Sequence, residues 1–400
     1  MSSTCTILPQ GFNVKQIYFD HNATTPLRPE VLEEMIPYLR DHFGNPSSVH
    51  WAGRAVTGAL ETARERVASL INASPAEIVF TSCGSEADNF AIKGCAGALR
   101  EKGRHIITTV VEHPAVLESC RALEKMGWRV SYLPVDNQGQ LDLDHLEALI
   151  GAETVMISTM WANNETGTLF PIAKIGEIAR KHGVMFHSDM VQAVGRVSLD
   201  VKAVGLDLAA ISGHKFGAPK GVGALYIRSD TQLDPLINGG HQERNRRGGT
   251  SNLAGIVGLG VASRLAEREL EQTCAHVRSL RDHLEKGLFA GIEKLRVNGS
   301  TEPDKRLPNT LNLSFEGVSG ESLLLNLDLK GVAASSGSAC SSGTLESSHV
   351  IRALGVDPLM AQASVRFSLG RENTLDEVQH VLDVLPAIVA RLRKISPLVS

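Results

Sequence analysis

The sequence predicts an α/β protein, with a mostly parallel sheet in a large domain and a smaller α+β domain. Two observations support this fold class. Between about Ile78 and Tyr226, short apolar runs alternate with helical patterns, and strand–helix–strand repetition favours a parallel sheet with helices on both faces. After about Cys274 this alternation ends and a different order of elements follows.

Six short apolar runs are the predicted strands of the large domain. They are Ile78–Phe80, His105–Ile107, Val130–Tyr132, Val155–Ile157, Val184–Phe186 and Ala224–Tyr226. Between two of these runs, Ile172, Ile175 and Ile178 recur at helical spacing, and Gly183 is positioned to cap that helix. Because ligands in such folds bind beyond the carboxyl ends of the strands, we expect the functional residues there.

The chain after Cys274 predicts the smaller domain. Its expected elements are a charged helix from Val277 to Phe289, a strand from Leu311 to Phe315, a Ser/Gly/Ala-rich loop from Ala333 to Thr344 and a last helix from about Leu375 to Leu392. We therefore assign residues 25–273 to the large domain, and residues 1–24 together with 274–400 to the small domain.

The composition argues against several functional classes. The chain has 400 residues and a net charge of −4, so no basic surplus drives contacts with nucleic acid or an anionic membrane. Its six cysteines form no C-x-x-C pair, which fits a reducing cytosol better than a disulfide framework or a zinc site. No secretory signal is visible over residues 1–16, and no apolar stretch approaches about 20 residues. We expect a soluble, cytoplasmic protein.

A lysine follows one predicted buried strand. Lys215 ends the run Ser212-Gly213-His214-Lys215, directly after the apolar segment Leu206–Ile211. A lysine amine is a good nucleophile when it is held neutral in a partly desolvated site, and this position suits that chemistry. Taken alone, a loop lysine is more often a surface residue, so the interpretation depends on its companions.

Asp189 and Gln192 come just past the apolar run Val184–Phe186. A carboxylate here can hydrogen-bond a pyridinium nitrogen and keep it protonated. An aspartate of this kind and a Schiff-base lysine are what a protein supplies to pyridoxal phosphate. Gln192 can reach the phenolic oxygen of the same ring. The alternative for Asp189 is a helix N-cap.

The segment Thr81-Ser82-Cys83-Gly84-Ser85-Glu86 is a candidate phosphate-binding turn. It follows the strand Ile78–Phe80 and opens a helix through Phe90 and Ile92. Small residues at a helix N-terminus expose backbone N–H groups that suit a phosphate dianion. Ser/Gly turns before helices are common, so this segment alone is weak evidence. The dinucleotide motif G-x-G-x-x-G and the P-loop motif are both absent from the sequence.

In order along the chain, these segments resemble the cysteine desulfurases of the nitrogen-fixation and iron–sulfur-assembly type, within the fold type I superfamily of pyridoxal-phosphate enzymes. The resemblance runs from about Tyr18 to Arg391. The matching stretches are Tyr18–Pro26, Phe43–Ser48, Glu112–Val116, Trp161–Gly167, Gly213–Lys215, Arg247–Thr250, Ser335–Cys340 and Val365–Arg371. Each stretch is moderately specific, and the ordered set is highly specific.

The resemblance implies a role for each matching site residue. Lys215 would hold the cofactor and move protons, and His113 would be a further catalytic residue that stacks on its ring and also moves protons. Gly84, Ser85, Ser212 and His214 would bind its phosphate, with Thr250 reaching in from the second subunit of a homodimer. Asn164, also near the cofactor, and Arg366 would clasp the substrate's α-carboxylate, for which arginine offers a bidentate fork. Ordinary alternatives are a structural histidine for His113 and a surface ion pair for Arg366.

Cys340 is the expected sulfur acceptor. It stands in the run Ala334–Gly343, which is rich in Ser and Gly and is not expected to pack as core. A loop of about ten residues at about 3.3 Å each can swing its tip by 10 Å or more. The long Ser-Ser-Gly-Ser-Ala-Cys version resembles the group of the family that serves scaffold proteins.

The implied reaction removes sulfur from L-cysteine, giving L-alanine and a Cys340 persulfide. The persulfide would then pass to an iron–sulfur scaffold or another sulfur acceptor. No resident metal is expected, apart from transient contact of Cys340 with a partner's cluster. Two alternatives are another enzyme of this fold, such as a selenocysteine lyase, and a non-catalytic assembly scaffold. The sequence departs from the family pattern at Ser85, Met190, Gly249 and Ser347.

Overall fold

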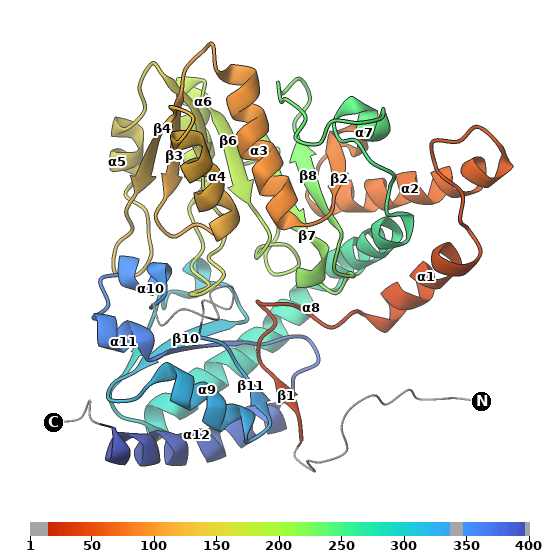
Figure 1. Ribbon diagram of the computed structural model, residues 1–400. Coiled ribbons are helices and arrows are strands. Elements are labelled where there is room, and N and C mark those ends of the chain that lie inside the picture. Colours follow the sequence, from red (N-terminus) through yellow and green to blue (C-terminus); the bar gives the residue numbers. More distant parts are fainter. Residues whose placement is uncertain (1–14, 337–346, 397–400) are drawn as a thin grey trace, which may run out of the picture.

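The structure is a computed structural model, and it describes residues 15–336 and 347–396. Cys340 therefore lies outside the described residues. Figure 1 shows a large sheet flanked by helices, below which lies a smaller group of strands and helices from the C-terminal part of the chain.

The large sheet has seven strands. They are β2 (Ile78–Thr81), β3 (His105–Thr109), β4 (Arg129–Leu133), β5 (Thr154–Ser158), β6 (Met185–Asp189), β7 (Leu208–Ser212) and β8 (Gly223–Ile227). Their order is β2-β8-β7-β6-β5-β3-β4. In this sheet β8 runs in the opposite direction to the other six strands, which are parallel to one another, so the prediction of a mostly parallel sheet is confirmed. Five of the six predicted runs lie within strands; Val184 instead precedes β6.

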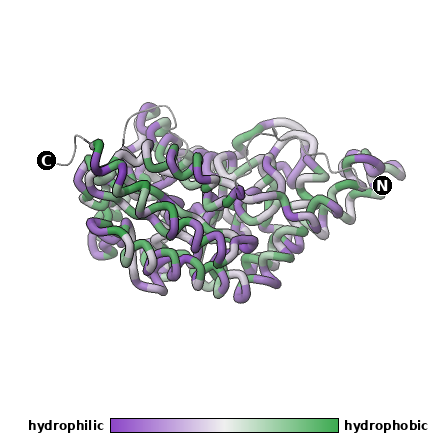
Figure 2. The backbone as a smooth tube through the Cα atoms, turned by 90° about the horizontal axis from the view of Figure 1, so that it is seen from below, coloured by the Kyte–Doolittle hydropathy of each residue, from purple (hydrophilic) through white to green (hydrophobic). Residues whose placement is uncertain are grey.

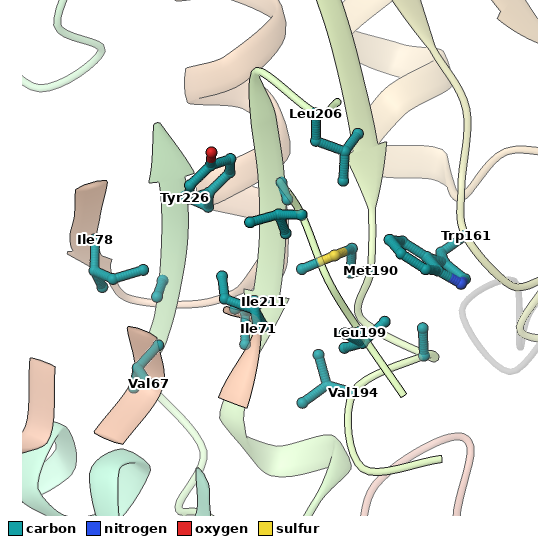
Figure 3. Packing of buried hydrophobic residues seen from close by; sticks show 14 of the residues in the cluster. Val67, Ile71, Ile78, Trp161, Met190, Val194, Leu199, Leu206, Ile211 and Tyr226 are labelled. Atoms are coloured by element: carbon teal, nitrogen blue, oxygen red, sulfur yellow. The ribbon is translucent and has the colours of Figure 1, made fainter. Parts of the chain in front are cut away.

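Helices cover both faces of this sheet, as predicted. On one face lie α3 (Gly84–Leu99) and α4 (Pro114–Glu124), with Leu208 and Ala210 of β7 in their core. On the other face, Ala209 and Ile211 pack with α2 (Trp51–Leu70), α6 (Ile172–His182) and part of α8. Successive side chains of a strand point to opposite faces, so each strand contributes to both cores. Figure 3 shows part of the second core.

The predicted helix through Ile172, Ile175 and Ile178 is confirmed as α6, with Gly183 as its C-terminal cap. Ile172, Ile175 and Ala179 are buried on one stripe of the helix. Gly183 follows with a φ of 64°, and its N–H donates to the carbonyl of Arg180. A left-handed residue at this position ends a helix, and glycine adopts it without the strain that a Cβ adds.

The remaining elements of the N-terminal two thirds are short or peripheral. They are α1 (Pro29–Arg40), α5 (Leu143–Ala148), α7 (Gln242–Asn245) and two 3-10 turns, η1 (Pro75–Glu77) and η2 (Gly213–Lys215). Of these, η2 carries the lysine that follows β7.

The smaller group has its own hydrophobic core. Its strands are β9 (Leu295–Val297), β10 (Thr310–Phe315) and β12 (Ser364–Ser368), antiparallel in the order β12-β10-β9, and the parallel pair β1 (Ile17–Tyr18) and β11 (Val332–Ala333). Its helical elements are η3 (Pro303–Lys305), α9 (Gly320–Asp328), α10 (His349–Ala353), α11 (Pro358–Gln362) and α12 (Leu375–Ile395). The predicted strand Leu311–Phe315 and the predicted last helix are confirmed.

The predicted helix from Val277 to Phe289 was too short, because it is the second half of α8 (Leu253–Gly291), a helix of 39 residues. Glycine weakens an isolated helix, and Gly258 and Gly260 obscure the first half. A Cβ built on Gly258 would lie 2.6 Å from Met35 Sδ, and one on Gly260 would lie 2.6 Å from Ala63 Cα. Close packing against α1 and α2 therefore stabilises this half and explains its glycines.

None of the helices within the described residues is both long and apolar enough to cross a membrane. Figure 2 shows hydrophilic and hydrophobic residues alternating along the helices instead of forming long apolar segments.

Candidate active site

A cavity of about 590 Å³ lies at the carboxyl ends of the central strands. It collects most of the predicted site residues, which are Gly84, Ser85, His113, Asn164, Asp189, Gln192, Ser212, His214, Lys215 and Arg366. Its volume is in the range of ligand pockets, which is about 300–1,000 Å³. The sequence prediction that these residues meet at the strand ends is therefore supported by their positions.

Lys215 lines this cavity, and its amine contacts backbone carbonyls. The strand β7 ends at Ser212, and the single turn η2 carries the lysine beyond it. Its Nζ donates to the carbonyl oxygens of Asn22, at 2.6 Å, and Ala23, at 2.8 Å. These neutral acceptors orient the amine within the cavity.

Asp189 is the last residue of β6 and is buried. Its Oδ1 accepts a hydrogen bond from the backbone N–H of Val191 at 2.9 Å. Burial raises the pKa of Asp189, and the charges of His113 and Lys215 oppose that rise. A carboxylate in this setting favours a cationic partner inside the cavity.

Asp88 is a buried acid that the sequence analysis did not identify. It lies one turn into α3, and burial raises its pKa well above the usual value. Ligand atoms of Asp88, His113 and Asp189 lie within 4.8 Å of one another. The available signal was the i, i+4 spacing from Gly84, which places both residues on one face of the helix.

His113 caps the N-terminus of α4. Its Nδ1 accepts a hydrogen bond from the backbone N–H of Ala115 at 3.1 Å. An accepting Nδ1 places the proton of the neutral ring on Nε2. Burial lowers the pKa of His113, so the neutral form is favoured. A neutral, oriented imidazole suits stacking on a flat ring.

The first turn of α3 forms one end of the cavity. Gly84 and Ser85 are its first two residues. A Cβ built on Gly84 would lie 2.8 Å from Val191 Cγ2 and 3.2 Å from Ser212 Cβ, so glycine allows α3 to pack closely against these two residues. The N–H groups of a helix N-terminus favour an anion here.

His214 joins this end of the cavity from η2. Its Nδ1 lies 3.0 Å from Thr24 Oγ1. Burial, followed by the nearby charge of Lys215, lowers the pKa of His214 to about 4. The ring is therefore neutral near pH 7, so it contributes a hydrogen bond and not a charge.

Arg366 on β12 also lines the cavity. This arginine is buried, and its Nη2 lies 2.7 Å from Asp20 Oδ1. Its Nη1 donates to the carbonyl oxygen of Asn164 at 2.9 Å. Because β12 belongs to the smaller group of strands, the cavity lies between the two hydrophobic cores.

Asn22 connects these parts, although the sequence analysis treated it only as part of a motif. Its carbonyl accepts from Lys215, and also from Gln192 Nε2 at 3.0 Å. Its side-chain Nδ2 donates to the Asn164 carbonyl at 3.1 Å and to Thr310 Oγ1 at 2.9 Å. The segment through Asn22 therefore joins Lys215, Gln192 and Asn164.

Thr250 is not in this cavity. It lines a separate pocket with Thr81, Ser82 and Arg247. Arg247 pairs with Glu86 at 2.9 Å, which holds this loop near the start of α3. The position is compatible with a contribution to another copy of the chain, which remains a prediction.

The flanks of the undescribed segment around Cys340 lie at the cavity. Before it, the backbone of Ser335 exchanges hydrogen bonds with that of Arg366 at 3.2 and 2.6 Å. After it, Ser348 Oγ donates to the buried carboxylate of Glu165 at 2.5 Å. His349, which the sequence analysis did not single out, lines the cavity, and its Nε2 lies 3.1 Å from the Glu112 carbonyl.

Two departures from the family pattern have a structural reason. Met190 does not line the cavity, because its side chain packs in the core beside Trp161 and Val194 (Figure 3). Gly249 has a φ of 108°, which side chains rarely adopt. Neither departure changes a cavity-lining group.

The fold and the cavity together define a class of α/β enzymes that hold a phosphorylated ring cofactor between a strand-end lysine and a buried aspartate. The sequence model of the aminotransferase class-V family matches residues 17–381, and the chain belongs to this family. Its members are pyridoxal-phosphate enzymes.

Known relatives agree with this assignment. The chain is 52% identical to a cysteine desulfurase of Trichormus azollae, over 95% of this chain and 94% of the relative. Among solved structures, a "NifS-like protein" has a TM-score of 0.89 and 39% identity, covering 94% of this chain and 100% of that one. The structure of SspA in complex with cysteine has a TM-score of 0.79 and 35% identity, covering 90% of this chain and 100% of that one.

Proposed function

We propose that this protein is a pyridoxal-phosphate-dependent cysteine desulfurase, which converts L-cysteine to L-alanine and supplies the sulfur, as a Cys340 persulfide, for iron–sulfur cluster assembly. The observation that carries the proposal is the meeting of the Lys215 amine, the Asp189 carboxylate and the N-terminus of α3 in one cavity. The names of the family's relatives support the choice of substrate.

The residues present fit the cofactor. Asp88 and Asp189 form a buried, acidic corner that suits a protonated ring nitrogen, with Asp189 as its partner. Gly84, Ser85 and Ser212 line the cavity where α3 begins, so the N–H groups of this helix N-terminus would bind the phosphate. Lys215 would attach the cofactor covalently, Gln192 would donate to its ring oxygen, and His113 would stack on the ring. When bound, the cofactor takes up the electron pair left by loss of the substrate's α-proton.

Arg366 and Asn164 would bind the substrate's α-carboxylate. The guanidinium is oriented by Asp20 and by the Asn164 carbonyl, so little side-chain freedom is lost when a carboxylate binds. Lys215 Nζ would take the α-proton of L-cysteine and return it to carbon as alanine forms. Its two carbonyl contacts hold this amine on the side of the cavity where Asn22 lies.

The sulfur transfer balances without a further reagent. The thiolate of Cys340 attacks the substrate sulfur, an S–S bond forms, and the substrate's Cβ–S bond breaks. The electron pair of the broken bond remains on carbon and is protonated to the methyl group of alanine. One L-cysteine and one Cys340 thiol thus give one L-alanine and one Cys340 persulfide.

The proposed homodimer would complete the phosphate end with Thr250 of a second copy. Apolar side chains are exposed along α1 and into the start of α2, at Leu32, Ile36, Leu39, Phe43, Val49 and Trp51. In Figure 1 these helices project from one side of the molecule. Contiguous exposed apolar side chains favour burial in an interface, which supports a second copy at this face.

The proposed domain division has support from the two cores. The first half of α8 contributes Leu259 to the core of the large sheet, and the second half contributes Leu284 to the smaller core. The proposed boundary between residues 273 and 274 falls between these halves. The helix crosses it without interruption.

The test is release of sulfide and alanine from L-cysteine with a thiol reductant, comparing native protein with Cys340→Ser. We expect equal amounts of both products from the native protein and neither from the variant. The matched control is Cys274→Ser, which changes a half-buried thiol and should leave turnover intact. Full turnover by Cys340→Ser would refute the persulfide step. Absence of turnover by native protein with bound cofactor would refute the proposal that L-cysteine is the substrate.

A further inference from the structure

Arg196 is a buried cation next to the candidate site, yet the proposed reaction does not use it. It lies in the turn after β6 and is 9% exposed. Within the part of the chain that the structure describes, its guanidinium donates only to neutral oxygens, which are Gln192 O at 2.9 Å, Gln192 Oε1 at 2.6 Å, His21 O at 3.3 Å and Lys215 O at 3.5 Å. Among the described residues, no carboxylate forms an ion pair with it. Such burial of a charge is costly, so a specific role is expected.

The shortest of these contacts determines how the amide of Gln192 is oriented. A guanidinium only donates hydrogen bonds, so the Gln192 atom at 2.6 Å from Arg196 must be the amide oxygen. The amide nitrogen then faces the other way, and it donates to the Asn22 carbonyl at 3.0 Å. Both partners require the same orientation, and the amide nitrogen keeps a second N–H.

Gln192 lines the cavity, so this orientation determines what the cofactor meets. With the oxygen held by Arg196, only an N–H is offered from Gln192 toward the ring. In the flipped amide, the oxygen would face the ring oxygen and repel it. A glutamine in solution does not favour one of the two orientations, and here Arg196 and the Asn22 carbonyl both select the same one, Arg196 through the shorter contact.

We propose that Arg196 is a positioning residue for the cofactor, which fixes the Gln192 amide so that it donates to the cofactor's ring oxygen. This inference rests on the proposed cofactor site. The same guanidinium reaches the carbonyls of His21 and Lys215, so it also joins the segment before Asn22 to the turn that carries the lysine.

The groups that surround Arg196 are mostly basic or neutral. Those that interact electrostatically with it are Arg366, Cys274, His21 and His214, and Lys215 contributes its carbonyl. Burial, with Arg196 next, lowers the pKa of His21 to about 4, and the pKa of His214 is also about 4. Both imidazoles are neutral near pH 7, so they do not replace the charge of Arg196.

The test measures the pH midpoint at which the visible band of the bound cofactor changes, in native protein, Arg196→Met and Arg196→Lys. A donor to the ring oxygen stabilises that oxygen when it is most negative, which is the deprotonated form. Losing the donor raises the midpoint. We expect a rise of about 1 pH unit for Arg196→Met, the size of one net hydrogen bond. Arg196→Lys, which still only donates, should stay within about 0.3 units of native.

A double-mutant cycle separates positioning from a general effect on stability or charge. Gln192→Leu alone should also raise the midpoint. In that background Arg196→Met should add less than half of its shift in native protein, because its target is gone. Equal shifts in both backgrounds, or an unchanged midpoint in Arg196→Met, would overturn the inference.

If Arg196→Met does not fold, a second variant at the same position still tests the inference. Arg196→Gln stays polar but can accept as well as donate, so residue 196 no longer requires the Gln192 amide oxygen to face it. It should raise the midpoint by at least about 0.5 units, and no shift would contradict the inference. If native protein itself shows no visible band with added pyridoxal phosphate, the proposed function fails, and this result is distinct from failure of the Arg196 role.

Discussion

Glu112, the residue before His113, provides a test of how the buried acids of this site affect stability. Its carboxyl group is fully buried, and Oε1 accepts from Thr109 Oγ1 at 2.8 Å and from the Met160 N–H at 3.0 Å. Burial raises the pKa of Glu112 from 4.5 to about 8, although these two hydrogen bonds oppose the rise. Glu112 is therefore protonated in the folded protein near pH 7.

The size of the effect on stability follows from the pKa of Glu112 in the unfolded chain, 4.5, and in the folded protein, about 8. Below about pH 4.5 the carboxyl group is protonated in both states, so its contribution to stability is fully present. As the pH rises toward 8, the unfolded chain gains by ionising and the folded protein does not, so stability falls by about 1.4 kcal/mol per pH unit. From pH 5 to pH 7 this loss is about 3 kcal/mol. Glu112→Gln keeps the acceptor oxygen and cannot ionise, so it should lack this loss.

Urea unfolding at pH 5, 6 and 7, with saturating cofactor, measures the difference. We expect the free energy of unfolding of native protein to fall by about 3 kcal/mol relative to Glu112→Gln over this range. The matched control is Glu118→Gln on α4, whose side chain is 64% exposed and which should follow native protein. The same pH dependence in native protein and Glu112→Gln would show that Glu112 is ionised in the fold, and the reasoning would be refuted.

Two further predictions concern the cofactor and the substrate. Lys215→Ala should lose the visible band of the bound cofactor, because the covalent attachment is gone, whereas the exposed neighbour Lys220→Ala should keep it; an intact band in Lys215→Ala would place the attachment elsewhere. Arg366→Lys should keep the band but raise KM for L-cysteine about tenfold or more, because a point charge replaces a bidentate fork. The control is exposed Arg352→Lys, and an unchanged KM in Arg366→Lys would place the substrate carboxylate elsewhere.

The elements that could be predicted most accurately from the sequence are those whose structure is determined by a local pattern of residues. The strands and α6 followed from periodicity and from Gly183, because burial of alternate or helical positions leaves a direct trace in the sequence. The first half of α8 was missed because Gly258 and Gly260 are poor helix formers whose cost is offset by close packing against Met35 and Ala63. That packing is tertiary, and no local pattern reports it.

The candidate site shows the same division. Lys215 and Asp189 could be predicted because Asp189 ends one strand and Lys215 lies just beyond another, and strand ends meet at one edge of a parallel sheet. Asn22, Asp88 and Arg196 act through contacts with residues far away in the chain or on another element. Thr250 could not be placed by reasoning within one chain, since it lines a different pocket from Lys215.

The buried acids around the cavity suggest why these costly groups are gathered at the strand ends. Burial raises the pKa of Asp88, Glu112, Glu165 and Asp189, so each of them reduces the stability of the protein at neutral pH. Asp88 and Asp189 face the same part of the cavity and repel each other when both are ionised. A protonated ring nitrogen held there would convert this repulsion into attraction. Relief of this repulsion would therefore add to the free energy of cofactor binding, and it would favour the protonated form of the ring nitrogen.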